Sequence, residues 1–114
     1  MDIEVVKKPI SLDQLKSIAH HQFVDLVKAV VDVEQEIMVI GGEHHVDERD
    51  FLMENEESKF ENLWGIDLYP ERTGKSFVEL ESAINLKLSS GSRGVYHPAV
   101  QEKIIKVVER LILK

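Results

Sequence analysis

The chain of 114 residues contains no cysteine, only three prolines and few aromatic residues. The absence of cysteine excludes disulfide bonds, thiolate zinc sites, iron–sulfur ligation and cysteine nucleophiles. No apolar run approaches the roughly 20 residues that a membrane-spanning helix needs. The first eight residues alternate in charge and lack the apolar stretch of a signal peptide. We therefore expect a soluble, cytoplasmic protein with no membrane partner.

Basic residues are also in short supply. The chain has 14 Lys and Arg residues against 21 Asp and Glu residues, a net charge of −7. The stretch from Glu43 to Glu61 is the most acidic part, with eight acidic and two basic residues. Because phosphate neutralisation dominates affinity for nucleic acids, we expect no nucleic-acid partner.

What the chain does have is the composition of an ordinary globular protein, with 43% hydrophobic and 31% charged residues. A chain of this length buries roughly two-thirds of its unfolded surface, which is enough for stability without metal or disulfide crosslinks. We therefore expect one domain over residues 1–114.

Helical signals lie near both ends of the chain. Ser11 followed by Gln14 forms a capping box, which predicts a helix over about residues 12–23. Pro98 suits the first position of a second helix, which we expect to continue to the C-terminus. Apolar residues at helical spacing support that helix: Val100, Ile104, Val107, Val108 and Leu111.

The middle of the chain predicts strands. Residues 26–40 form a hairpin whose tight turn is Glu34-Gln35-Glu36. Residues 63–69 form a strand with Trp64 on one face and Asp67 on the other. Alternation over residues 77–88 exceeds a usual strand length, so we expect a bend near residues 81–83 that divides it in two. A short strand over residues 3–7 is a further candidate.

These elements predict an α+β, two-layer fold. Hairpin-length connections cannot make parallel crossovers, so we expect an antiparallel meander of about five strands. The N-terminal and C-terminal helices are expected to pack on one face of that sheet.

Glycines, imidazoles and carboxylates coincide in one segment, residues 40–50. In extended backbone Glu43, His45 and Asp47 point one way and His44 the other. The first three could then converge as ligands of a divalent transition metal such as Zn, Mn or Ni. The alternative, which we favour, is a strand-to-helix turn in which His45 and Asp47 hydrogen-bond to each other. Asp47 would then cap a helix over about residues 48–54.

Two weaker signals remain. The loop over residues 89–94 resembles an anion-binding loop with Arg93 on the anion, although a flexible connector fits its composition better. His20 and His21 lie near the end of the first predicted helix. Adjacent positions on a helix diverge by about 100°, so we expect one packed and one solvated imidazole.

Several segments together resemble a family of small bacterial and archaeal proteins of unknown function. They are Gly41-Gly42-Glu43 with His45 and Asp47, then Leu63-Trp64-Gly65-Ile66, and Tyr69-Pro70. The resemblance covers nearly the whole chain. It implies a stand-alone domain and carries no known activity; His45 fits the motif position, whereas His44 is additional.

We therefore expect a small binding or interaction module. A homodimer through a sheet edge or the C-terminal helix would cover exposed strand edges. The alternative is a metal-dependent hydrolytic enzyme, in which Glu43, His45 and Asp47 are ligands or acid–base groups and Arg93 stabilises an anion. A third possibility is a regulatory partner whose acidic segment mimics nucleic acid and binds a basic protein.

Overall fold

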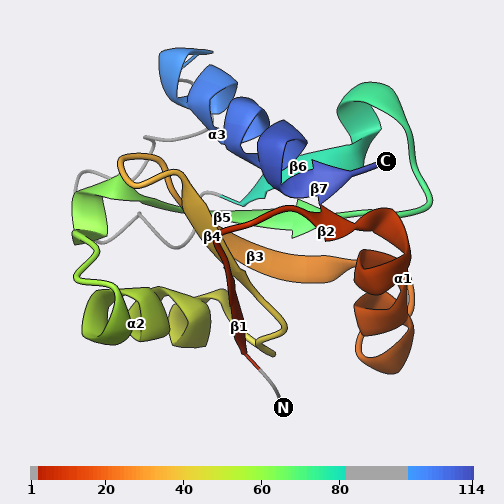
Figure 1. The fold of residues 1–114 in the computed structure, drawn as a ribbon, viewed down its shortest axis with the longest axis horizontal. Coiled ribbons are helices and arrows are strands. Elements are labelled where there is room, and N and C mark those ends of the chain that lie inside the picture. Colours follow the sequence, from red (N-terminus) through yellow and green to blue (C-terminus); the bar gives the residue numbers. More distant parts are fainter. Residues whose placement is uncertain (1–2, 82–97) are drawn as a thin grey trace.

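An antiparallel sheet forms the centre of the structure (Figure 1). The structure is a computed structural model and describes residues 3–81 and 98–114. Within these residues the sheet has five strands, in the order β1 (Glu4–Val6), β4 (Ile37–Ile40), β3 (Val27–Asp32), β5 (Leu63–Leu68) and β6 (Val78–Glu81). The predicted α+β class with a five-stranded antiparallel sheet is therefore confirmed. The second half of the long alternating segment, beyond residue 81, lies outside the described residues.

The hairpin between β3 and β4 forms as predicted, and the Asp32 side chain fixes its turn. Its Oδ1 atom accepts hydrogen bonds from the backbone N–H groups of Glu34 (2.9 Å) and Gln35 (3.0 Å). Its Oδ2 atom accepts from the Ser58 hydroxyl at 2.7 Å. Asp32 is buried, and these donors satisfy its carboxylate, so its role is structural.

The connection from β4 to β5 departs from a strict meander. Helix α2 (His45–Asn55) lies in this connection, and β5 pairs with β3 instead of β4. Ala29 of β3 lies between Ile40 of β4 and Ile66 of β5. Strands β4 and β5 are both antiparallel to β3, so they run in the same direction. Their C-terminal ends therefore lie at the same end of the sheet.

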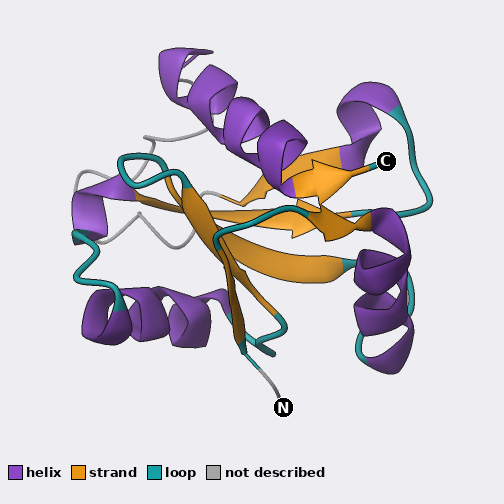
Figure 2. Ribbon diagram, viewed as in Figure 1, coloured by secondary structure: helices purple, strands orange, loops and turns teal. Residues whose placement is uncertain are grey.

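The two faces of the sheet carry separate apolar clusters. Buried residues of α1 (Leu12–His21) and α3 (Pro98–Leu111) share one cluster with Trp64, Ile66 and Leu68. Leu52 of α2 belongs to a second cluster with Val30, Val39 and Leu63. Strand alternation separates the two sets, as the sequence predicts for Trp64 and Asp67. Figure 2 shows α2 and α3 on opposite sides of the sheet, so α2 adds a layer beyond the two that we predicted.

Helix α1 begins as predicted. The Ser11 hydroxyl accepts from Gln14 N at 3.1 Å, and the Gln14 side chain accepts from Ser11 N at 3.0 Å. The helix ends at His21, two residues earlier than we predicted.

Helix α3 ends at Leu111 instead of continuing to the C-terminus. The next residues form strand β7 (Ile112–Leu113), which pairs in parallel with β2 (Ile10–Ser11). Figure 1 shows these two short strands side by side. The sequence did not predict this pair. Two short 3₁₀ helices, η1 (Phe60–Asn62) and η2 (Gly74–Phe77), precede β5 and β6.

Candidate functional site

Helix α2 starts earlier than the sequence predicted. The prediction placed it at about residues 48–54 with Asp47 as its cap, whereas it runs over His45–Asn55. Its N-cap is His44, whose backbone is extended and whose side chain makes no capping hydrogen bond. The prediction that Asp47 caps the helix is therefore wrong, because Asp47 already lies inside the first turn.

This earlier start separates the residues that we expected to converge. His45 and Asp47 are two positions apart on a helix, where side chains do not face each other. Glu43 lies before the helix and is exposed, as is Asp47. Within residues 3–81 and 98–114, no group of three or more His, Asp or Glu side chains is placed to hold a metal ion. Arg93, the fourth predicted site residue, lies outside the described residues.

His45 contacts strand β5. Its Nε2 atom lies 2.8 Å from the backbone oxygen of Ile66, to which it donates, and 3.1 Å from Oδ1 of Asp67. The favoured hydrogen bond between His45 and Asp47 is therefore wrong, since the partners of His45 come from a distant strand.

Glu48 lies one turn after His45 and is fully buried. Its Oε2 atom accepts from the backbone N–H of Gly42 at 2.9 Å, and its Oε1 atom has no hydrogen-bond partner among the residues that the structure describes. Burial raises the pKa of this carboxyl from 4.5 to about 9, and the hydrogen bond from Gly42 opposes the shift only in part. Glu48 is therefore a neutral acid at neutral pH.

Charged residues on the neighbouring strands surround this carboxyl. Lys28 of β3 pairs in register with Asp67 of β5, on the same side of the sheet as α2. Lys28 lowers the pKa of Glu48, whereas Asp67 and Asp47 raise it. We name Lys28, His45, Glu48 and Asp67 the His45 site.

Sequence reasoning missed three members of the His45 site, namely Lys28, Glu48 and Asp67. Asp67 was placed on the correct face of its strand, but no signal linked it to His45. Glu48 was counted only as part of an acidic stretch. Its spacing of three residues from His45 would have placed both on one helix face, had the helix start been known.

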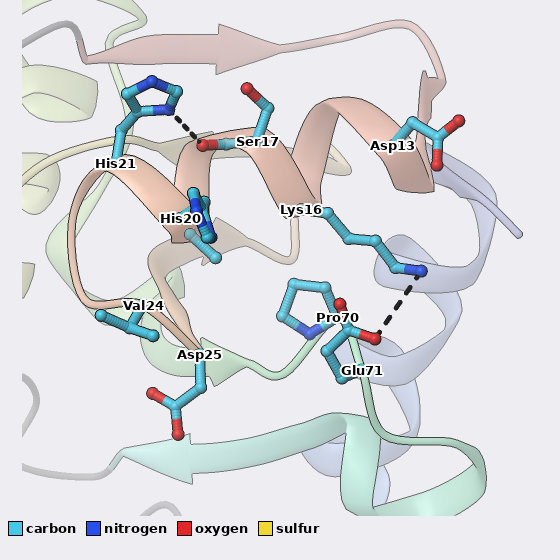
Figure 3. A pocket seen from close by; sticks show the side chains of 10 residues that line it. Asp13, Lys16, Ser17, His20, His21, Val24, Asp25, Pro70 and Glu71 are labelled. Atoms are coloured by element: carbon cyan, nitrogen blue, oxygen red, sulfur yellow. Dashed lines mark hydrogen bonds and ion pairs between the residues drawn. The ribbon is translucent and has the colours of Figure 1, made fainter.

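A hollow of about 410 Å³ lies at the same end of the sheet, beside helix α1 (Figure 3). It is lined by residues of α1 between Asp13 and His21, by Val24 and Asp25, and by Pro70 and Glu71. We name it the α1 pocket. Val24 and Asp25 precede β3, and Pro70 and Glu71 follow β5, so the pocket and the His45 site share one end of the sheet.

A hydrogen bond joins the loop after α1 to the backbone before α2. The Gln22 side chain donates from Nε2 to the backbone oxygen of Gly41 at 2.6 Å. Gln22 follows α1 and lies in the loop that contains Val24. Gly41 precedes Gly42, whose backbone N–H donates to Glu48. The loop at the pocket is therefore tied to the backbone in front of α2.

Val24 has a strained backbone at the rim of the α1 pocket. Its φ angle is 75°, and the backbone N–H of Asp25 donates to the oxygen of Phe23 at 2.9 Å. This bond spans three residues and forms a γ-turn, whose form with positive φ is rare and strained. A β-branched residue is a poor choice for such a turn. The side chain gains little from burial, since it is 72% exposed.

The two adjacent histidines of α1 both line the pocket, and both are exposed. The prediction of one packed and one solvated ring is therefore wrong. Figure 3 shows the imidazoles on different sides of the helix, with Nδ1 of His21 at 2.8 Å from the Ser17 oxygen. His20 lies on the side that faces Val24 and Pro70.

Comparison with known proteins gives one match. Residues 4–111 match the family described as Protein of unknown function (DUF5674), and the chain belongs to this family. No curated protein and no solved structure matches the chain. The predicted membership of a family of unknown function is confirmed. Among the described residues, no helix is long and apolar enough to cross a bilayer.

Proposed function

We propose that this chain is a small ligand-binding module and that the α1 pocket is its binding site. The observation that carries the proposal is the strained γ-turn at Val24, on the rim of a hollow of ligand size. Known small-molecule pockets have volumes of about 300–1,000 Å³, and the α1 pocket at about 410 Å³ falls in this range.

The turn at Val24 also ends helix α1, since the Val24 N–H donates to the backbone oxygen of Ala19 at 2.7 Å. A non-glycine residue at positive φ costs on the order of 1–3 kcal/mol and persists where the surroundings or a function require it. The Val24 side chain is 72% exposed, so burial does not offset this cost in the free protein. A ligand in the pocket would cover Val24 and use the shape of the turn.

Mapping of ligand contacts by NMR tests this proposal. We expect a library of small polar and apolar fragments to perturb backbone amide signals of residues 16–25 and 70–71. A His20→Trp variant places a larger ring on the side of α1 that faces Val24 and Pro70 and should abolish these perturbations. Met53→Trp places the same ring on an exposed position of α2 and should leave them unchanged.

Perturbations that persist in His20→Trp would place binding elsewhere. A library in which no fragment perturbs the pocket residues would contradict the binding function.

The His45 site favours a second candidate function, acid–base catalysis of a hydrolytic reaction. Burial keeps Glu48 neutral one turn after His45, whose Nε2 atom lies 3.1 Å from Oδ1 of Asp67, so a proton donor and an imidazole share one helix face. Two of the segments on which the predicted resemblance rests meet here, because His45 contacts Ile66. Hydrolysis of a p-nitrophenyl ester panel by the wild type, lost in a folded His45→Asn variant, would support this candidate. Equal rates in both proteins would remove it.

A further inference from the structure

We infer that the α1 pocket takes an organic cation with an apolar stem, an alkylammonium or alkylguanidinium group. This inference names the class of ligand and rests on the proposed function of the pocket. Three features of the pocket carry it: its excess of carboxylates, its apolar walls and its exposed Val24.

Carboxylates outnumber ammonium groups in the lining. Asp13, Asp25 and Glu71 contribute three acidic side chains, against the single amine of Lys16. Lys16 lies 3.8 Å from Glu71 and compensates that one carboxylate. In the part of the chain that the structure describes, no ion pair involves Asp13 or Asp25. The Asp25 carboxylate, beside Val24, is therefore left for a ligand, whereas Asp13 lies at the other end of α1 (Figure 3).

The charge of the whole chain acts in the same direction. The net charge of −7 produces a negative potential around the protein, which attracts cations and repels anions during encounter. An anionic ligand would be repelled both by this potential and by the carboxylates that line the pocket.

Apolar side chains form the walls between these charges. Ala19 and Pro70 contribute buried surface, and Val24 contributes an exposed side chain at the rim. Figure 3 shows Pro70 facing α1 and Asp25 beside Val24. An alkyl stem packed on Val24 and Pro70 would place its charged end within reach of the Asp25 carboxylate. Long charged side chains combine an apolar stem and a charged head in this way.

Such a cation has two sources, a free amine or the side chain of an arginine or lysine in a polypeptide. Titration calorimetry with n-butylguanidinium and with the peptide acetyl-Gly-Arg-Gly-amide compares them. Equal affinities indicate that the alkyl cation itself is the ligand. A peptide that binds at least about tenfold more tightly, a difference of about 1.4 kcal/mol, indicates a polypeptide partner.

The charge requirement is tested with butyrate and n-butanol, which share the alkyl stem. We expect n-butylammonium and n-butylguanidinium to bind, and the anion and the alcohol to bind at least about fivefold more weakly at low ionic strength. The double variant Asp13→Asn/Asp25→Asn should weaken cation binding by about fivefold or more. The matched control Glu54→Gln/Glu61→Gln removes the same charge from exposed positions outside the pocket and should change affinity less than twofold or so.

Two results overturn the inference in different ways. If butyrate or butanol binds the pocket as tightly as the cations, the class of ligand is wrong and the binding function stands. The same holds if the Asp13→Asn/Asp25→Asn variant binds the cations unchanged. If none of the four probes and no fragment perturbs the pocket residues, both the inference and the proposed function fail.

Discussion

Glu48 is the residue whose protonation matters most for stability. The unfolded chain releases this proton near pH 4.5, whereas the folded protein keeps it to about pH 9. The folded state therefore binds one more proton between these pH values, and stability falls as the pH rises through this window. The slope from this one group is up to about 1.4 kcal/mol per pH unit.

Replacement of Glu48 by Gln tests this linkage. Glutamine keeps the shape and the acceptor for the Gly42 N–H, and it has no proton to lose. We expect Glu48→Gln to be more stable than the wild type at pH 8, by a few kcal/mol, and to have a flatter stability profile between about pH 5 and 9. Urea unfolding at several pH values measures both. The exposed Asp47→Asn should keep the wild-type slope, and equal slopes in wild type and Glu48→Gln would contradict the prediction.

Val24 provides a prediction about backbone strain. Val24→Gly removes a β-branched side chain from a φ angle of 75°, where glycine is unstrained. The relief of strain outweighs the extra entropy of glycine in the unfolded chain, so we expect stabilisation by about 0.5–2 kcal/mol. Val46→Gly removes a partly exposed valine from α2 and should destabilise instead. A loss of stability in both variants would show that the turn is not strained.

At the scale of elements, the approach of α2 to strand β4 depends on Gly42. A Cβ atom at this position would lie 2.6 Å from Cγ of Glu48, closer than real Cβ contacts. We expect Gly42→Ala to destabilise the protein by about 1–3 kcal/mol, because Glu48 must move and its hydrogen bond to Gly42 is disturbed.

A double-mutant cycle isolates this contact. In a Glu48→Ala background the obstructing Cγ is absent, so Gly42→Ala should cost clearly less than in the wild type. Chemical denaturation of the four proteins gives the coupling free energy. A cost of Gly42→Ala that is the same in both backgrounds would exclude the contact as its cause.

Elements with local signals could be predicted from the sequence. The Ser11 and Gln14 side chains that start α1 are three residues apart, and the turn that Asp32 fixes spans residues 32–35. Such interactions form within one turn, so residue types alone reveal them. The apolar spacing of α3 and the alternation of β5 are local in the same sense.

The candidate site depends on distant contacts and could be predicted only in part. The sequence selected His45 as a candidate site residue, but the partners of His45 lie 21 and 22 positions later in the chain. Helix α2 has no capping side chain at His44, so its start has no local signal. The extended backbone assumed for Glu43, His45 and Asp47 failed for this reason. The α1 pocket could not be predicted, because Val24 and Pro70 meet only through the pairing of β3 with β5.

At the scale of the whole molecule, the homodimer predicted from the sequence stays a prediction. Light scattering coupled to size exclusion should give twice the mass of the chain, with a dimer fraction that falls on dilution. Strand β1 lies at one edge of the sheet, and Glu4→Pro would block addition of a partner strand there. Loss of the dimer in this variant points to the β1 edge, whereas its retention points to the C-terminal helix or to the β6 side of the sheet. Only monomer at every concentration would remove the dimer.

The pairing of β2 with β7 has a consequence for how the chain is made. Ile10 pairs with Ile112, so β2 is synthesised about a hundred residues before its partner. At about 5–20 residues per second, β2 waits on the order of ten seconds for β7 during translation. A chain that ends before Ile112 lacks a buried residue of the apolar cluster that α1 and α3 share. It also leaves β2 without β7, the strand with which it pairs. The β2–β7 pair can therefore form only after the ribosome has synthesised β7.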